Sequence, residues 1–282
     1  MDPAPKLTPK LTLNNGVLMD QAGYGTYKVP PQDTAPLVNA ALSTGYRHID
    51  TAALYGNEEG VGKAVRNFTD NGHVVREDLF VTSKVWNTDH GYDAALRAFD
   101  VSMAKFGFEY LDLYLIHWPC PDRGLFVQTY KALEELYASG RVRAIGVSNF
   151  NRGHLEELLD SAAVVPAVNQ VELHPWLAQK ELRSFHETHG IRTVAWSPLG
   201  RGAVLEDPAV VEIANSTGRT AAQVVLRWHV QAGHTVIPKA SSEDRMTANL
   251  DIFSFELEPE QVAVLDGLDS GRRTGSNPAE VN

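Results

Sequence analysis

The sequence predicts an α/β protein folded as a closed (β/α)8 barrel, the TIM-barrel architecture. Short apolar or β-branched runs alternate about eight times with longer segments of helical periodicity, which indicates a parallel sheet covered by helices. The chain has 282 residues, 43% of them hydrophobic, and a barrel of this kind typically takes about 250 residues. No linker or low-complexity tract divides the chain. We therefore expect one barrel domain over residues 1–282.

The first expected element is a β-hairpin ahead of the barrel, in "KLTLNNGVLMD" at residues 10–20. Asn15 and Gly16 at its centre favour a type I′ turn, because both residue types tolerate positive φ. We expect this hairpin to plug the floor of the barrel. The first two barrel strands are then expected in "DQAGYGTY" (20–27) and "YRHIDTA" (46–52).

Six further strands are expected, each followed by a helical segment. The strands are the apolar runs at 79–85, 111–118, 142–150, 166–173, 191–199 and 234–240. Helical periodicity places helices at 92–106, 125–140, 152–161, 179–190, 208–218, 220–233 and 242–250. A short tail closes the chain and ends in "GSNPAEVN".

Composition excludes several classes of function. The formal net charge is −10, which argues against a nucleic-acid binder that relies on a basic face. Cys120 is the one cysteine, so an internal disulfide and a multi-cysteine metal site are excluded. The first residues contain no apolar signal region, and no later run is long enough to span a bilayer. We expect a cytoplasmic, monomeric protein with no membrane or nucleic-acid partner and no metal.

The glycine-rich stretch "GNEEGVGKA", residues 56–64, raises the question of a phosphate-binding loop. It has one residue too many for that loop and an Ala where the metal-binding hydroxyl belongs. No G-x-G-x-x-G fingerprint is present elsewhere. The favoured alternative is the start of a helix, with Glu58 and Glu59 in its first turn. Similarly, His186 and His189 share one helical face, and a solvated face is favoured over a metal site there.

In a barrel of this kind, function gathers where the carboxyl ends of the strands meet the following loops. The polar residues at these expected strand ends are Asp50, Lys84, His117, Ser148, Asn149, Asn169, Gln170, Trp196, Ser197 and Lys239. A polar residue at one strand end is not informative by itself. Polar residues at so many strand ends would, in a closed barrel, all lie around the same opening. We expect the active site there.

Four of these side chains point to proton transfer: Asp50, Lys84, His117 and, five residues after Asp50, Tyr55. A free phenol has a pKa of about 10. An ammonium about 4 Å away would lower that value by up to ~3 units, which would make Tyr55 a general acid. Asp50 would hold Lys84 charged, and His117 would orient a substrate oxygen. A purely structural Asp–Lys ion pair stays open as an alternative for each residue taken alone.

Proton donation to a carbonyl also needs a hydride source, and the last strand end suggests one. In "IPKASSEDRMTANL", Ser241 or Ser242 caps a helix whose N-terminus attracts anions, and Lys239 and Arg245 add positive charge. This pattern favours a phosphate site in an acidic chain. A solvated helix face is the alternative that this stretch leaves open.

Together, "GYRHIDTAALYGNEEGVGKAV", "LDLYLIHWP", "IGVSNF", "NQVELHP", "WSPLGRG" and "IPKASSEDRMTANLDIF" resemble the aldo-keto reductase superfamily. The resemblance runs in order from about Thr12 to Gly271, and it is closest to bacterial 2,5-diketo-D-gluconic acid reductase-like members. It implies a barrel that binds NADPH without a Rossmann fold. It also implies reduction of aldehydes and ketones, such as small carbonyls, α-dicarbonyls or keto-sugars.

The resemblance implies a role for each matched residue. Tyr55 is the general acid, Asp50 and Lys84 tune it, and His117 orients the carbonyl. The implied coenzyme contacts are Gly25, Thr26, Tyr27, Asp50, Ser148, Asn149, Gln170, Trp196, Ser197, Pro198, Leu199, Gly200, Lys239, Ala240, Ser241, Ser242, Arg245 and Asn249. Trp196 stacks on the nicotinamide, at a position that is often Tyr in this family. The implied substrate contacts are Tyr24, Tyr55, Trp86, His117 and Trp118.

Two departures from the family pattern lie at the adenosine end of the expected coenzyme site. Ala240 stands where a Ser is common, and Ala248 where a Glu often contacts the adenine. Both bear on coenzyme affinity and on the preference for NADPH, and neither touches the four catalytic residues. Two rival functions remain: a sensor or scaffold that binds the coenzyme without turnover, and a barrel isomerase or hydrolase acting on phosphorylated substrates.

Overall fold

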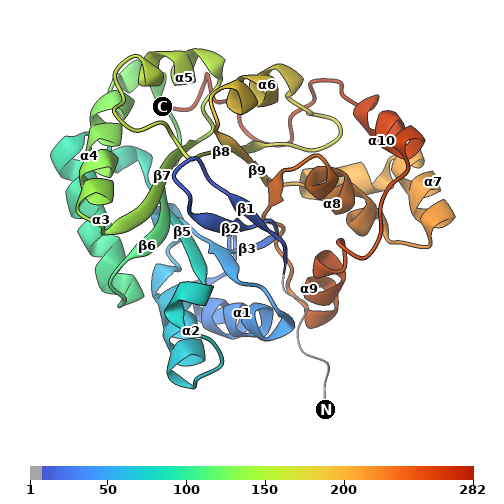
Figure 1. Ribbon diagram of the computed structural model, residues 1–282, viewed down its shortest axis with the longest axis horizontal. Helices are drawn as coiled ribbons and strands as arrows, with labels where there is room; N and C mark the ends of the chain where they lie inside the picture. The colour runs from blue at the N-terminus through green and yellow to red at the C-terminus, as the bar shows by residue number, and fades with distance from the viewer. Residues whose placement is uncertain (1–7) are drawn as a thin grey trace.

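The computed structural model describes residues 8–282 and shows a ring of eight parallel strands surrounded by helices, as the sequence predicts (Figure 1). The strands are β3 (Gly23–Gly25), β4 (His48–Asp50), β5 (Phe80–Val85), β6 (Leu111–Ile116), β7 (Val142–Ser148), β8 (Val168–Glu172), β9 (Arg192–Trp196) and β10 (Thr235–Val236). Each pairs with the next in chain order. A parallel bridge between Ala22 and Val236 joins the first strand region to the last and closes the barrel.

Helices cover the outside of the ring (Figure 1). They are α1 (Pro31–Thr44), α2 (Glu58–Asp70), α3 (Tyr92–Phe106), α4 (Phe126–Ala138), α5 (Arg152–Leu159), α6 (Lys180–Thr188), α7 (Pro208–Thr217), α8 (Ala221–Gln231), α9 (Glu243–Leu250) and α10 (Pro259–Asp266). Within residues 8–282, none of these helices has the length and apolar character needed to cross a bilayer. The first seven residues of the expected domain lie outside the described residues.

Alternation along the strands divides the apolar side chains into two cores. On β6, Tyr114 and Ile116 belong to the large core between the sheet and the helices. Leu113 and Leu115 point the other way, into a smaller core inside the barrel. This period of two is what a strand buried on both faces requires. It also places Asp50, at the end of β4, on the inner side of the ring.

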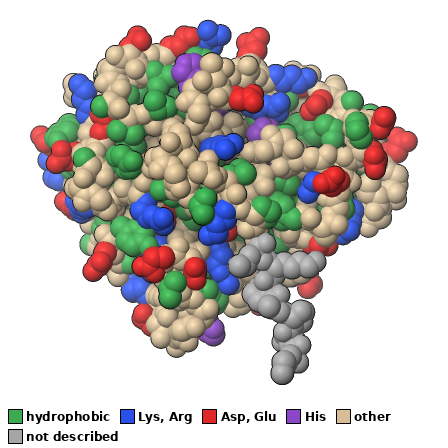
Figure 2. Space-filling model, in the orientation of Figure 1, with side chains coloured by type: hydrophobic (Ala, Val, Ile, Leu, Met, Phe, Trp, Pro, Cys, Tyr) green, Lys and Arg blue, Asp and Glu red, His purple; other side chains and the backbone are tan. Residues whose placement is uncertain are grey.

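The hairpin closes the floor of the barrel, as expected. Its strands β1 (Lys10–Thr12) and β2 (Leu18–Asp20) pair antiparallel and lie across the middle of the ring in Figure 1. Leu13 and Met19 pack in the inner core with Phe80 and Leu113. Figure 2 shows acidic and basic side chains interspersed on this face.

The turn of the hairpin differs from the predicted type I′. Gly16 has a φ of 86°, but Asn15 is not among the described residues with positive φ, and type I′ needs positive φ at both positions. The Gly16 N–H instead donates to the Leu13 carbonyl at 2.9 Å, and the Leu13 N–H donates to the Val17 carbonyl at 2.8 Å. The hairpin therefore uses a longer loop with a single left-handed glycine.

The glycine-rich stretch begins α2, as the favoured alternative held, and its glycines serve helix packing. A Cβ added at Gly62 would lie 2.2 Å from the Phe106 carbonyl oxygen at the end of α3. A Cβ added at Gly60 would lie 2.8 Å from the Thr34 Cβ on α1. Both distances are too short for any side chain. Glycine at these positions lets α2 lie tightly between its two neighbours.

Candidate active site

The carboxyl end of β4 carries a buried ion pair. The Lys84 ammonium of β5 donates to Asp50 Oδ1 at 2.6 Å and to the Thr51 carbonyl at 2.8 Å. The Gln170 side chain, from β8, donates to Asp50 Oδ2 at 2.7 Å. Asp50 and Lys84 are both buried, and a buried charge pair is tolerable only when its remaining polar atoms are bonded in this way.

Tyr55 reaches the same place from a 3-10 turn, η1 (Ala53–Tyr55), that follows β4. The Lys84 Nζ lies 5.3 Å from the centroid of the Tyr55 ring. The Tyr55 ring also meets His117 edge-on, with centroids 5.6 Å apart. The structure thus brings Asp50, Tyr55, Lys84 and His117 to one end of the barrel.

The pKa of the Tyr55 hydroxyl moves opposite to the expected direction. Burial raises this pKa well above its ordinary value, and Asp50 and Tyr27 raise it further. The expected net lowering is wrong, because burial of the phenol outweighs the stabilisation of its phenolate by Lys84, whose ammonium is paired with Asp50 at 2.6 Å. Burial likewise lowers the pKa of Lys84, against the opposing effect of Asp50. Tyr55 is therefore a neutral, fully protonated phenol at physiological pH.

His117 follows β6 and is a neutral imidazole. Burial lowers its pKa well below the ordinary value, and the charge of Lys84 lowers it further. Its Nδ1 is buried and has no hydrogen-bond partner among the described residues. The ring packs edge-on against Trp86 at 5.0 Å and parallel to Trp118 at 6.5 Å. A neutral imidazole so placed can donate one hydrogen bond from Nε2 to an oxygen in the mouth.

Two residues of the glycine-rich stretch hold Tyr55 in place, and sequence reasoning missed both roles. The buried Asn57 side chain accepts from the Thr51 hydroxyl at 2.7 Å and donates to the Thr26 carbonyl at 3.0 Å. The buried Glu58 carboxylate accepts from the Ser83 hydroxyl at 2.7 Å and from Lys105 at 3.2 Å. The loop that carries Tyr55 is thus tied to its neighbours on both sides. The available sequence signal was a polar Asn and an acidic Glu shortly after the apolar run that ends at Asp50.

The expected nicotinamide contacts form one hydrogen-bonded network. Asn149 donates to the His117 carbonyl at 2.9 Å and to the Ser148 hydroxyl at 3.1 Å. Its Oδ1 accepts from the Trp196 indole N–H at 2.7 Å. The Ser148 hydroxyl donates to the Gln170 carbonyl at 2.8 Å. These residues come from β7, β8 and β9, and they lie directly beside the Asp50–Lys84 pair.

The expected phosphate contacts lie at the start of α9. Lys239, Ser241, Ser242 and Arg245 are all exposed. Ser242 is the N-cap residue but makes no side-chain capping bond, so the first N–H groups of α9 are not satisfied by it. Asn249 is buried at the next-to-last position of α9. Gly25, Thr26, Ser197, Pro198, Leu199 and Gly200 stand at other strand ends of the same mouth.

Tyr24 does not line the mouth, which corrects the expected substrate contact. The Tyr24 side chain is 0% exposed, and its hydroxyl donates to the Ala240 carbonyl at 2.8 Å. Its position on β3 turns the ring outward, against Tyr46 in the core under the helices. Tyr27, three residues later, is 47% exposed, and its ring centroid lies 5.1 Å from that of Tyr55. Tyr27 therefore occupies the position expected for Tyr24.

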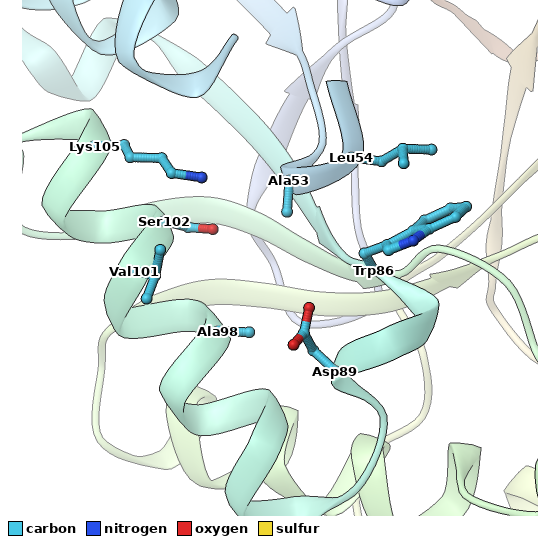
Figure 3. A pocket seen from close by; sticks show the side chains of 8 residues that line it. All are labelled: Ala53, Leu54, Trp86, Asp89, Ala98, Val101, Ser102 and Lys105. Carbon is cyan, nitrogen blue, oxygen red and sulfur yellow. The ribbon is translucent and has the colours of Figure 1, made fainter. Parts of the chain in front are cut away.

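Two other expected substrate residues, Trp86 and Trp118, are partly exposed beside His117. Leu54, which sequence reasoning did not name, is 46% exposed next to Tyr55. A hollow of about 230 Å³ lies on the outer side of Trp86, between η1 and α3 (Figure 3). It is lined by Leu54, Asp89 and Ser102 among others, and neither Tyr55 nor His117 reaches it.

The buried His186 corrects the prediction of a solvated face on α6. Its ring nitrogens pair with the Asn169 side chain and the Thr193 hydroxyl, both at 2.9 Å. His189 is exposed and stacks on Phe185. The first histidine therefore holds α6 against β8 and β9.

A sequence model of the aldo/keto reductase family matches residues 19–270. Glyoxal reductase of Bacillus subtilis (strain 168) is 49% identical over 276 residues, 98% of this chain and 98% of that protein. Morphine 6-dehydrogenase of Pseudomonas putida is 45% identical over 289 residues, 98% of this chain and 96% of that protein. A mutant of Gox0644 in complex with NADPH has a TM-score of 0.92 at 45% identity, covering 98% of this chain and 100% of that one. None of these three bears the name of a diketo-gluconic acid reductase, so that finer likeness stays a prediction.

Proposed function

The chain belongs to the aldo/keto reductase family and is an oxidoreductase, and we propose that its reaction is the NADPH-dependent reduction of aldehydes and ketones to alcohols. The observation that most supports this is the meeting of Tyr55, Lys84, Asp50 and His117 at one end of the barrel. A protonated phenol beside a buried ammonium and a neutral imidazole suits proton donation to a carbonyl oxygen.

The proposed reaction divides between coenzyme and protein. NADPH, when bound, supplies the hydride that reaches the carbonyl carbon. Tyr55 gives its hydroxyl proton to the carbonyl oxygen, so hydride and proton together complete the alcohol. A nascent alkoxide is far more basic than a phenolate, so even a phenol of raised pKa transfers its proton to it. Lys84, close to the ring, stabilises the phenolate that remains, and His117 Nε2 orients the oxygen.

The residues present fit NADPH. The α9 N-terminus carries N–H groups that Ser242 leaves uncapped, and Lys239 and Arg245 form no ion pair within residues 8–282. An uncapped helix N-terminus with two free cations suits the adenosine 2′-phosphate. The partly exposed Trp196 indole, held by Asn149, offers a flat face for the nicotinamide ring. Thr26 and the loop of Gly200 would border the remaining coenzyme.

The walls of the mouth indicate the substrate class. Tyr27, Trp86 and Trp118 surround the Tyr55 and His117 side chains with aromatic surface. We propose small aldehydes and α-dicarbonyls as the preferred substrates, with keto-sugars as a second class. The similarity to a glyoxal reductase supports this choice.

Tyr55→Phe tests the function. It removes the proton donor but keeps the ring, so NADPH should bind as in the unaltered protein. Turnover of methylglyoxal should fall by about 10²–10⁴-fold, the usual contribution of a general acid. The measurement is NADPH binding by calorimetry, together with NADPH oxidation at 340 nm across a panel of aldehydes, α-dicarbonyls and keto-sugars.

Tyr92→Phe, an exposed tyrosine on α3, is the matched control and should leave both readings unchanged. Near-normal turnover by the Tyr55 variant would overturn the assignment of the general acid. NADPH binding without turnover of any carbonyl by the unaltered protein would favour a sensor or scaffold instead.

A further inference from the structure

We propose that the C-terminal tail is a structural support for the coenzyme end of the active site, in which Glu172, Thr274 and Gly275 act as positioning residues for Trp196. This inference rests on the proposed function, because it gives Trp196 its place beside the nicotinamide. The tail comprises residues 272–282.

Glu172 anchors the tail. It is the last residue of β8, and its side chain is buried. One of its oxygens, Oε1, accepts three bonds from the tail: from the Thr274 N–H at 2.6 Å, the Thr274 hydroxyl at 2.7 Å and the Gly275 N–H at 2.9 Å. The other oxygen lies 3.6 Å from Arg273 Nη1. Bonds to a buried carboxylate are stronger than bonds between neutral groups, so this part of the tail is firmly held.

Gly275 brings the tail into contact with Trp196. A Cβ built on Gly275 would lie 2.3 Å from Cη2 and 2.9 Å from Cζ3, atoms of the six-membered ring of the indole. No side chain fits there unless the indole or the tail moves. The wide indole of Trp196 is therefore matched by a residue without a side chain in the tail.

Hydrogen bonds connect Trp196 to the catalytic residues, so the placement of its indole affects theirs. Its indole N–H donates to Asn149 Oδ1 at 2.7 Å, and Asn149 Nδ2 donates to the His117 carbonyl at 2.9 Å. Asn149 has a φ of 65°, a left-handed conformation that needs support from its surroundings. A shift of the indole would therefore break or bend the contact that supports the His117 backbone.

The end of the tail is fixed on the far side of the mouth. Asn282 accepts from the Asp122 N–H at 2.9 Å and donates to the Asp122 carboxylate at 3.0 Å. Asp122 lies in the loop that follows β6 and His117. In Figure 1 the chain accordingly runs from α10 on one side of the barrel to its C-terminus on the other.

The test is a double-mutant cycle between Gly275→Ala and Trp196→Tyr. Gly275→Ala alone should raise the Kd of NADPH about tenfold, because the added methyl displaces the indole. In the Trp196→Tyr background the same substitution should change the Kd by less than about twofold, since the shorter ring leaves room for the methyl. Calorimetry gives the Kd, and initial rates separate the KM for NADPH from kcat.

Thr274→Val provides a second route that adds no atom to the contact with Trp196. It removes one of the bonds to Glu172 and should also raise the Kd of NADPH and speed the removal of the tail by a carboxypeptidase. Thr274→Ser keeps the hydroxyl and is the matched control, with both readings unchanged.

The outcomes separate this inference from the proposed function. If Trp196→Tyr alters NADPH binding but Gly275→Ala and Thr274→Val do not, the support role of the tail is overturned and the function stands. Equal effects of Gly275→Ala in both backgrounds would also overturn it, because the indole would not be the group displaced. If none of the variants alters NADPH binding, while Tyr55→Phe still abolishes turnover, Trp196 does not border the coenzyme and the inference fails.

Discussion

At the residue scale, the hydrogen bonds among the side chains of the site determine which of their polar atoms remain available. Both Asp50 carboxylate oxygens are occupied, one by Lys84 and the other by Gln170. The sequence predicts that Asp50 and Lys84 meet, but it predicts Gln170 only as a coenzyme contact. Its bond to Asp50 could not be predicted, because two side chains that meet across a barrel leave no pattern in the local sequence. The pKa of Tyr55 has a similar explanation. The sequence predicts the proximity of Lys84 and its pairing with Asp50, but it does not show how deeply the phenol is buried, and burial is the main cause of the raised pKa.

Arg245 gives a prediction for the coenzyme preference. Arg245→Ala removes a cation that forms no ion pair within residues 8–282, beside the uncapped start of α9. We expect the Kd of NADPH to rise about tenfold or more, and that of NADH by less than about twofold, because only NADPH carries the 2′-phosphate. Calorimetry with both coenzymes is the measurement. Arg97→Ala, an exposed arginine on α3, should change neither value. Equal losses for the two coenzymes would place the 2′-phosphate elsewhere.

At the element scale, α2 shows how one segment can suggest the wrong chemistry. Its glycines resemble a phosphate loop in sequence, but they face Thr34 on α1 and Phe106 on α3. Its N-cap residue, Asn57, and its first residue, Glu58, fix the loop that carries Tyr55. Motif spacing alone was enough to reject the phosphate loop. It could not show the packing role, since that depends on helices distant in the chain.

Gly62→Ala tests this packing. Alanine is the better helix former by about 1 kcal/mol, but its Cβ would lie 2.2 Å from the backbone of Phe106. Overpacking of this kind costs about 1–3 kcal/mol, so we expect a net loss of stability, measured by urea unfolding. Gly153→Ala, a glycine inside α5 with its nearest contact at 3.6 Å, is the control. It should be neutral or stabilising. A Gly62 variant as stable as its control would show that the helices can separate at no cost.

At the scale of the whole molecule, the barrel was predictable because each strand and helix carries its own periodicity. The eight strands and the floor hairpin follow from local pattern, and the mouth follows from the rule for strand ends. The predictions that the structure contradicts concern the orientation or surroundings of single residues. Tyr24 and Tyr27 are both aromatic residues near the first strand end, and only the facing of Tyr24 on β3 shows that it points outward. The link between Glu172 and the tail joins segments more than a hundred residues apart.

Buried histidines predict how the whole protein responds to acid. Burial lowers the pKa of His90 and His186 to about 4 and that of His234 to about 3, with Arg123 adding to the effect at His90 and Arg183 at His234. An unfolded histidine titrates near about 6.5. Below that pH the histidines of the unfolded chain bind protons, whereas the buried histidines of the folded protein stay neutral. The stability from these neutral histidines is therefore complete above about pH 6.5 and is lost as the pH falls toward 4.

Each such histidine lowers the free energy of unfolding by up to about 1.4 kcal/mol per pH unit. Three give up to about 4 kcal/mol per unit, so about 6 kcal/mol is lost between pH 6.5 and pH 5, a large part of the roughly 5–15 kcal/mol that stabilises an ordinary domain. Urea unfolding at pH 7, 6 and 5 measures the slope. His90→Gln should reduce the slope by the contribution of one histidine. A free energy that stays level between pH 7 and 5 would contradict the prediction.

The Asp50–Gln170 bond has a consequence for how variants of this protein are interpreted. β4 and β8 stand four places apart in a ring of eight strands, so this 2.7 Å contact crosses the lumen from one wall to the opposite wall. The carboxylate for which we propose a role in the reaction also connects the two opposite walls of the barrel rim. Replacing Asp50 removes both a negative charge and the hydrogen bond to Gln170. The resulting loss of rate therefore has two causes that this variant cannot separate. Gln170→Ala removes the hydrogen bond but keeps the Asp50 carboxylate. Comparing the two variants therefore separates the effect of the charge from the effect of the bond.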